Sequence, residues 1–283
     1  MILVGMSSGF VGHMRRRGIS RWASNARSGG YLLIWLIVWI VFLPGCEDNR
    51  SSSNSEIPFE QVGEPIVEMM TDGSYRCRPL GEGLFPGILY NHGGRGGAIG
   101  GDLEGVCRGF ARIGFIALSQ RRPNNVTLDG QFESVLGGFN ILRMTPGVDA
   151  NRIGIIGFSR GALLTLQVAV QLADAVRAIA ICAPAWGRGA LERTLLHAAR
   201  IQAPVRVYVA ENDNPEMGEM RADHVEISRI VERALRDAGN DVELTIYPAY
   251  PGGGHFLFFG VREPWWGDVS YFFNQVLVFG RAS

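Results

Sequence analysis

Short apolar runs alternate with longer segments of helical periodicity from residue 65 onward, and this alternation limits the possible folds more than any other feature of the sequence. Strands are expected at residues 65–70, 74–80, 86–91, 115–120, 152–158, 177–185, 205–210 and 241–250. Helices are expected at residues 103–114, 132–144, 162–175, 191–201, 222–239 and 266–279. A short opening hairpin followed by strand and helix in alternation predicts an α/β fold, with a mostly parallel eight-stranded sheet covered by helices on both faces.

The connection between the sixth and seventh expected strands is short. Residues 186–201 hold only about one helix's worth of chain. We therefore expect no large cap domain, and an open, shallow site at the carboxyl edge of the sheet.

The amino-acid composition excludes several classes of function. All 27 cationic residues are arginines, and the absence of lysine excludes a lysine-containing phosphate loop, a pyridoxal Schiff base and a lysine general base. The common zinc signatures H-E-x-x-H and paired C-x-x-C are also absent from the sequence, so we expect no metal and no cofactor. Without residues 1–46, 22 arginines stand against 27 acidic residues, and this acidic balance disfavours a nucleic-acid partner.

The first part of the chain has the pattern of an export signal. Five arginines and no acidic residue precede thirteen uninterrupted apolar residues at 31–43, whereas a spanning helix needs about 20. The next residues, "LPGC" ending at Cys46, resemble the bacterial lipobox, although proline at its second position departs from the commoner small residues. The alternative is an ordinary secretory signal or an uncleaved anchor, with Cys46 uninvolved. We expect a lipoprotein-type signal peptide at 1–45, a polar tether at 46–59 and a catalytic domain at 60–283.

This interpretation predicts a protein of the bacterial cell envelope that is anchored to a membrane by acyl chains on Cys46. An exported location also permits a disulfide. Cys77 and Cys107 are the more plausible pair, because Cys182 lies within an apolar strand; unpaired thiols remain the alternative.

The pattern G-x-S-x-G, which is typical of a serine nucleophile, occurs twice. The first match, around Ser7, falls in the expected signal peptide. The second, "GFSRG" around Ser159, lies directly between an expected strand and an expected helix, where a nucleophile elbow belongs. Gly157 and Gly161 suit a tight turn in which side chains would collide with the neighbouring strand and helix. Ser159 is therefore the candidate nucleophile.

A serine nucleophile at a turn of this kind needs a base and an acid, and both are expected to follow it in the chain. His197 and His224 sit among polar residues in expected helices and are interpreted as surface positions. His255 follows the last strand in "YPGGGHF" and is the candidate base. Asp213, in the loop after residues 205–210, is the preferred acid, with Glu211 as the rival.

The oxyanion hole should combine two backbone amides. The first is that of Arg160, directly after the nucleophile. The second is expected from Gly94 or Arg95 in "NHGGRGG", where glycines let the backbone approach a substrate oxygen and His92 braces the loop by hydrogen bonding.

The segments "LYNHGG", "GFSRG", "VAENDNP" and "GGGHF", in this order on the expected elements, resemble the α/β-hydrolase superfamily over about residues 60–280. The similarity is greatest to its dienelactone-hydrolase-like and prolyl-oligopeptidase-like branch. Dienelactone hydrolases proper carry a cysteine nucleophile, so the serine at 159 leaves lactone specificity in doubt. The resemblance implies a serine hydrolase acting on a small-molecule ester through Ser159, Asp213 and His255. The alternatives are a serine peptidase and a catalytically inactive binding lipoprotein of the same fold.

Four aromatic residues near the expected site have two possible roles. Trp186, Phe256, Trp265 and Trp266 either line an acyl pocket or pack against the closing helix. Several arginines there are candidates to bind an acidic group, with a solvated surface as the alternative: Arg95, Arg121, Arg122 and Arg160.

Overall fold

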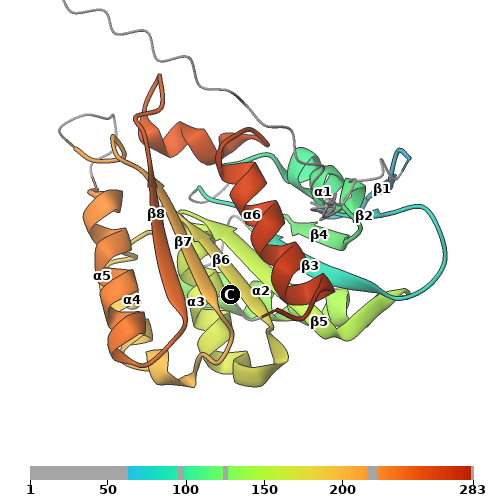
Figure 1. The fold of residues 1–283 in the computed structure, drawn as a ribbon, viewed down its shortest axis with the longest axis horizontal. Coiled ribbons are helices and arrows are strands. Elements are labelled where there is room, and N and C mark those ends of the chain that lie inside the picture. The colour runs from blue at the N-terminus through green and yellow to red at the C-terminus, as the bar shows by residue number, and fades with distance from the viewer. Residues whose placement is uncertain (1–62, 95–98, 124–126, 216–221, 282–283) are drawn as a thin grey trace, which may run out of the picture. The chain divides into compact units, whose positions relative to one another are not determined.

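The chain forms one eight-stranded sheet in the order β1-β2-β4-β3-β5-β6-β7-β8 (Figure 1). The computed structural model describes residues 63–94, 99–123, 127–215 and 222–281. The strands are β1 (Ile66–Met69), β2 (Tyr75–Arg78), β3 (Phe85–Asn91), β4 (Ile116–Gln120), β5 (Val148–Phe158), β6 (Ala178–Cys182), β7 (Val205–Ala210) and β8 (Val242–Tyr247). Cys46, Arg95 and the expected signal peptide and tether lie outside the described residues.

Strand direction sets where a site can form. The pairs β1·β2 and β2·β4 are antiparallel, and all pairs from β4 to β8 are parallel. The carboxyl ends of β3, β5, β6 and β7 therefore lie at the same edge of the sheet, which is the edge where open α/β sheets bind ligands. This confirms the predicted mostly parallel eight-stranded α/β sheet.

Helices cover both faces of the sheet, as the alternation predicted. The helices are α1 (Leu103–Arg112), α2 (Leu128–Arg143), α3 (Arg160–Leu172), α4 (Ala190–Leu195), α5 (His224–Asp237) and α6 (Trp265–Phe273). One core cluster contains buried residues of α2, α3, α4 and α5, and the other contains those of α1 and α6 together with Val225 of α5. Figure 1 shows α6 lying across the second face. The central strands are buried on both sides, which explains why they are apolar without alternation.

Caps define where two of these helices begin. Asp102 accepts a hydrogen bond from the Gly105 amide at the start of α1, and Asp223 accepts one from Glu226 at the start of α5. A side-chain cap of this kind typically contributes about 1 kcal/mol. The Asp223 cap makes His224 the first residue of α5.

The structure contains the disulfide that the sequence permitted but did not decide. Cys77 in β2 and Cys107 in α1 are bonded to each other, while Cys182 in β6 is a buried free thiol. The bond joins an edge strand to the helix that covers it and closes a loop of 30 residues.

Several observed elements differ from the expected ones. The closing helix ends at Phe273 and continues as a π-helical turn at Asn274–Val278. The expected helix at 191–201 consists of α4 and a separate 3-10 turn at Ala198–Arg200. A 3-10 helix at Gly254–Phe259, which periodicity did not predict, follows the glycine loop. Residues 183–204, between β6 and β7, hold no further element, so no large cap domain is inserted there.

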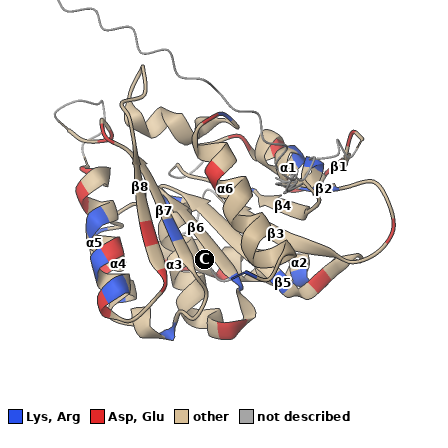
Figure 2. Cartoon of the chain, in the orientation of Figure 1, with Lys and Arg blue, Asp and Glu red and all other residues tan. Residues whose placement is uncertain are grey.

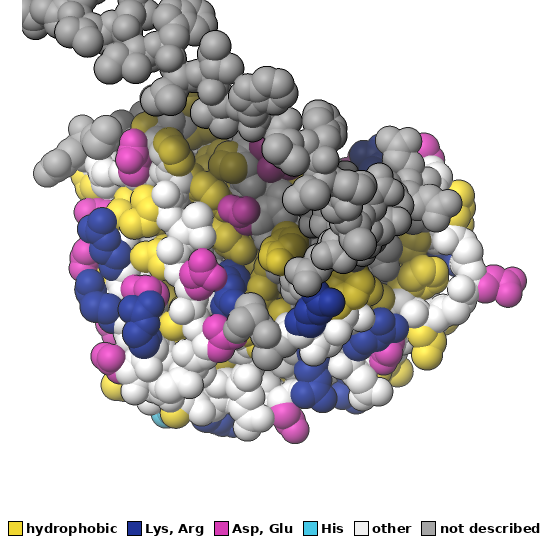
Figure 3. All heavy atoms as spheres, in the orientation of Figure 1, with side chains coloured by type: hydrophobic (Ala, Val, Ile, Leu, Met, Phe, Trp, Pro, Cys, Tyr) yellow, Lys and Arg dark blue, Asp and Glu magenta, His cyan; other side chains and the backbone are white. Residues whose placement is uncertain are grey.

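Charged residues of both signs are mixed on α5. Acidic and basic side chains share α5 (Figure 2), where Glu226 pairs with Arg229 and Arg233, and Glu232 with Arg236. The space-filling view shows the same mixture over that side of the molecule (Figure 3). Within the described ranges, none of the helices combines the length and apolarity needed to span a bilayer.

Candidate active site

Ser159 lies in a strained turn between β5 and α3. Its φ of 55° and ψ of −117° place a non-glycine residue outside the regions that side chains prefer, as expected for a nucleophile elbow. The Ser159 amide donates to the Cys182 carbonyl at 2.8 Å, and its carbonyl accepts from Ala185 at 3.1 Å. These bonds to the β6 end hold the turn in its strained conformation.

The two glycines of "GFSRG" are required by close backbone approach. A Cβ on Gly161 would lie 1.9 Å from the Asn91 carbonyl oxygen at the end of β3. A Cβ on Gly157 would lie 2.3 Å from the Gly161 carbonyl oxygen. Both distances are far below van der Waals contact, which agrees with the collision expected from the sequence.

Asp213 and His255 are joined by a buried hydrogen bond. His255 Nδ1 donates to Asp213 Oδ2 at 2.7 Å, and the two residues are 6% and 1% exposed. A carboxylate only accepts here, so Nδ1 carries the ring proton and Nε2 is left as the atom that can receive another proton. Gly254 makes this approach possible, because a Cβ there would lie 2.5 Å from the Asp213 amide nitrogen.

Glu211, the rival acid, points elsewhere. Its Oε1 accepts a hydrogen bond from the Ala249 amide at 3.0 Å, and the residue is exposed. Asp213 is therefore the acidic residue of this loop that contacts His255.

Ser159 and His255 face a common cavity of about 760 Å³. The His255 ring packs against Phe158, the residue before Ser159, with ring centroids 4.6 Å apart. No hydrogen bond joins Ser159 to His255 within the described part of the chain. Hydrogen bonds between a nucleophile and its base often form only once substrate is bound.

The loop after β3 forms another wall of the cavity. Gly93 and Gly100 exchange backbone hydrogen bonds of 2.7 and 3.2 Å, and Gly94, with φ +89°, lines the cavity together with Arg160. The Arg160 amide begins α3, so it lies at the positive end of the helix dipole. Arg95, the other predicted donor, is among the undescribed residues.

His92 ties this loop to the end of β4. Its Nδ1 donates to the Gly93 carbonyl at 2.5 Å, and its Nε2 accepts from the Arg122 amide at 3.3 Å. Burial, reinforced by the Arg122 charge, lowers the pKa of His92 to about 4. The ring is therefore neutral at neutral pH and able to keep both roles.

The candidate arginines separate into different environments. Arg160 lines the cavity together with Arg188, which was not among the predicted arginines. Arg122 is buried instead, and burial lowers its pKa to about 10. Its guanidinium lies against the His92 ring, and Arg122 is not among the residues that line the cavity.

The four aromatic candidates divide equally between the two roles foreseen for them. Trp186 and Phe256 line the cavity. Trp265 is 2% exposed in the core, and Trp266 packs on Phe110 with ring centroids 4.8 Å apart. The apolar lining of the cavity also includes Ile99, Leu128, Phe158, Leu163, Ala185, Ala222 and Phe259.

The surface assignment of His224 was wrong. The residue is 3% exposed, lines the cavity, and its ring lies 4.4 Å from that of His255, centroid to centroid. Its Nδ1 donates to the Pro184 carbonyl at 3.1 Å, and burial lowers the pKa of its ring. Its polar neighbours suggested a surface position, but the start of α5 packs against the carboxyl edge of the sheet. His197 is exposed, as expected.

Solved structures with this fold include esterases and a peptidase. An esterase from Pyrobaculum calidifontis is 17% identical, with a TM-score of 0.58, and the match covers 77% of this chain and 84% of the esterase. A fungal esterase from Rhizomucor miehei is 15% identical, with a TM-score of 0.55 and coverages of 77% and 84%. The acylaminoacyl peptidase of Pyrococcus horikoshii is 18% identical, with a TM-score of 0.59. This match covers 80% of the chain but only 44% of the peptidase. At these identities the likeness establishes the α/β-hydrolase fold alone.

Sequence comparison assigns the family. The search of curated proteins finds no match. The sequence model of the dienelactone hydrolase family matches residues 115–259, slightly more than half of the chain, from β4 to the 3-10 helix that carries His255. The chain belongs to the dienelactone hydrolase family.

Proposed function

We propose that this protein is a serine hydrolase that cleaves carboxylic esters through an acyl-enzyme, with Ser159 as nucleophile, His255 as base and Asp213 as the acid that orients the base. The observation that carries the proposal is the buried 2.7 Å bond between Asp213 and His255 beside the strained elbow of Ser159. A binding scaffold has no need of this combination.

The reaction begins with attack on the ester. Ser159 Oγ bonds to the carbonyl carbon while its proton passes to His255 Nε2, and the carbonyl electron pair moves onto oxygen. The amides of Arg160 and of Gly94 or Arg95 donate to this oxyanion. Loss of one such donor typically costs about 10²–10³ in rate, so the glycine loop is expected to matter strongly.

The intermediate then collapses. The ester C–O bond breaks, and the leaving alkoxide takes the proton from the imidazolium of His255. A water molecule next attacks the acyl-enzyme while His255 accepts its proton, and the second collapse releases the acid and restores Ser159.

The cavity lining favours an ester with an apolar acyl or alcohol part. Trp186, Phe256 and Phe259 supply aromatic surface, and Arg160 and Arg188 are the cationic side chains of the lining. No carboxylate belongs to this lining among the described residues. Esters that place a hydrocarbon group against the aromatic wall are therefore the preferred substrate class.

A fluorophosphonate probe tests the serine mechanism. The wild-type protein should be labelled, and Ser159→Ala should not. A folded wild-type protein that resists labelling would contradict the proposal and favour an inactive binding protein. Comparison of p-nitrophenyl acyl esters with aminoacyl amides then separates an esterase from a peptidase, and we expect the esters to be hydrolysed faster.

We also propose that Cys46 is lipidated and anchors an exported enzyme to a membrane of the bacterial cell envelope. The proposal is supported by the basic stretch, the apolar run at 31–43 and the "LPGC" motif. Expression in a bacterium with radiolabelled palmitate should label the wild-type chain but not Cys46→Ala. Equal labelling of both chains would contradict it.

A further inference from the structure

His224 is a second buried imidazole at the cavity, and the acyl-transfer steps proposed above do not use it. Its ring lies 4.4 Å from that of His255, with an angle of 34° between the ring planes. His224, His255 and Asp213 each present a possible ligand atom, and these atoms lie within 4.8 Å of one another. No sequence motif identifies this cluster, because its three residues come from three separate segments.

Hydrogen bonds fix the tautomer of both rings. The Pro184 carbonyl can only accept, so Nδ1 of His224 carries that ring's proton. Asp213 accepts from Nδ1 of His255 in the same way. A carbonyl or carboxylate on the far nitrogen is the usual outer-shell arrangement of metal-binding histidines in proteins.

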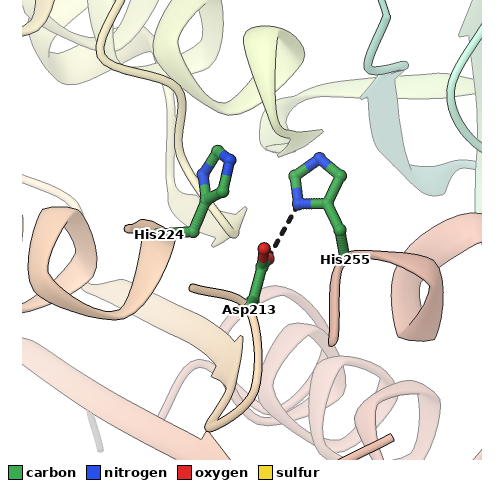
Figure 4. Close-up of side chains that lie close together, drawn as sticks. All are labelled: Asp213, His224 and His255. Atoms are coloured by element: carbon green, nitrogen blue, oxygen red, sulfur yellow. Dashed lines mark hydrogen bonds and ion pairs between the residues drawn. The ribbon is translucent and has the colours of Figure 1, made fainter. Parts of the chain in front are cut away.

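The remaining nitrogen of each ring is the one that these two hydrogen bonds leave unused. In Figure 4 the two imidazoles stand side by side, and the second nitrogen of each ring points away from Asp213. Both residues line the cavity, which provides space for an ion with its water ligands. The Nε2 atom of each ring therefore carries a lone pair that these hydrogen bonds do not use.

The local charge also favours a cation. Asp213 Oδ1 is buried and has no hydrogen-bond partner among the described residues. A carboxylate oxygen left without a donor retains negative charge close to both rings, and a divalent ion held by the imidazoles would offset that charge.

We propose that His224 and His255 form an inhibitory site for a borderline transition-metal ion such as Zn²⁺, with Asp213 as the outer-shell partner of His255. Zn²⁺ binds imidazole nitrogen at about 2.0–2.1 Å and completes a tetrahedron with water. Binding uses the Nε2 lone pair that otherwise receives the serine proton. A metal ion on His255 Nε2 therefore prevents His255 from acting as the base. This inhibition rests on the proposed function.

Binding is tested without hydrolysis. Calorimetric titration of Zn²⁺ into the full-length Ser159→Ala protein should reveal one site, and adding His224→Gln should weaken its affinity by at least about tenfold. Loss of an outer-shell partner alone costs about 10–100-fold, and loss of a direct ligand costs no less. His197→Gln, which removes an exposed histidine, is the matched control and should leave the affinity unchanged. Unchanged Zn²⁺ affinity in His224→Gln, or no binding at all, overturns the proposal.

His255→Gln in the Ser159→Ala protein removes the other proposed ligand. The conclusion then does not depend on whether one variant folds. It should weaken Zn²⁺ binding as much as His224→Gln does, and retained affinity overturns the proposal.

Inhibition is tested on the active protein. Zn²⁺ should reduce ester hydrolysis, EDTA should restore it, and Mg²⁺ at equal concentration should have no effect, because Mg²⁺ prefers oxygen ligands. The Zn²⁺ concentration for half inhibition, measured against each variant's own basal rate, should rise at least about tenfold in His224→Gln and stay unchanged in His197→Gln. Equal sensitivity of His224→Gln overturns the proposal. A wild-type protein without esterase activity would refute the proposed function, whereas the calorimetry would still decide the metal site.

Discussion

Asp213 and His255 are separated by 42 residues in sequence, yet Asp213 Oδ2 lies 2.7 Å from His255 Nδ1 in a buried hydrogen bond. The parallel sheet produces this contact, because the loop after β7 and the 3-10 helix after β8 leave neighbouring strands at the same edge. The contact holds the imidazole in the tautomer that a serine nucleophile needs.

Substitution of the proposed acid should cost most of the activity. Asp213→Asn keeps the shape but no longer favours the tautomer with the proton on Nδ1, and kcat for a p-nitrophenyl ester should fall by about 10⁴. Glu211→Gln is the control, since it retains an acceptor for the Ala249 amide, and it should remain within about threefold of wild type. A greater loss in Glu211→Gln than in Asp213→Asn would reverse the assignment of the acid.

The elbow glycine should be intolerant of a single methyl group. In Gly161→Ala the new Cβ would lie 1.9 Å from the Asn91 carbonyl oxygen, so the backbone has to move. We expect the free energy of unfolding to fall by about 3 kcal/mol or more, and the activity to be lost. Chemical denaturation followed by circular dichroism measures the change in the free energy of unfolding.

Gly137→Ala provides the matched comparison. Gly137 lies inside α2, and a Cβ there meets no atom within 4 Å. Alanine should stabilise the protein by about 0.5–1 kcal/mol through its higher helix propensity. Equal effects of the two substitutions would refute the steric explanation.

The buried His92 should make the fold sensitive to acid. Its pKa is about 4 when folded against an ordinary value near 6.5, so below pH 6.5 the unfolded chain binds more protons than the folded one. Stability should therefore fall as the pH drops from about 6.5 to 4, and His92 should account for about 3 kcal/mol of that loss.

The His92→Gln variant isolates this contribution. Glutamine can still donate and accept near Gly93 and Arg122 but does not titrate. Urea unfolding at pH 7 and pH 4.5 should show a smaller loss of stability in the variant. Parallel losses in the two proteins would mean that the acid sensitivity arises at other groups.

Reduction of the disulfide should lower stability without altering the site. The bond between Cys77 and Cys107 closes a 30-residue loop, for which the expected stabilisation is about 3–4 kcal/mol. Dithiothreitol should lower Tm of the wild type and leave Tm of Cys77→Ser/Cys107→Ser unchanged. Cys182→Ala, which removes the buried free thiol, should remain sensitive to the reductant. A wild-type Tm that does not respond would contradict the structural role of the bond.

The local sequence pattern predicted the structure correctly wherever a segment determines its own conformation. The strand and helix order, the elbow at Ser159 and the need for Gly161 follow from periodicity and from backbone sterics within a few residues. The 3-10 helix at Gly254–Phe259 was not predicted, because it is too short to show a helical period and follows a glycine run that is typical of a loop.

The sequence by itself determined the α/β sheet, the order of Ser159, Asp213 and His255 along the chain, and the absence of lysine chemistry. Only the tertiary structure placed Asp213, and not Glu211, against His255. It also divided the tryptophans between cavity and core, and buried His224 beside His255. The physical reason is that the first set depends on the period of apolar residues and on residue identity. The second depends on where a side chain points once distant segments pack at one edge of the sheet, which no local pattern specifies.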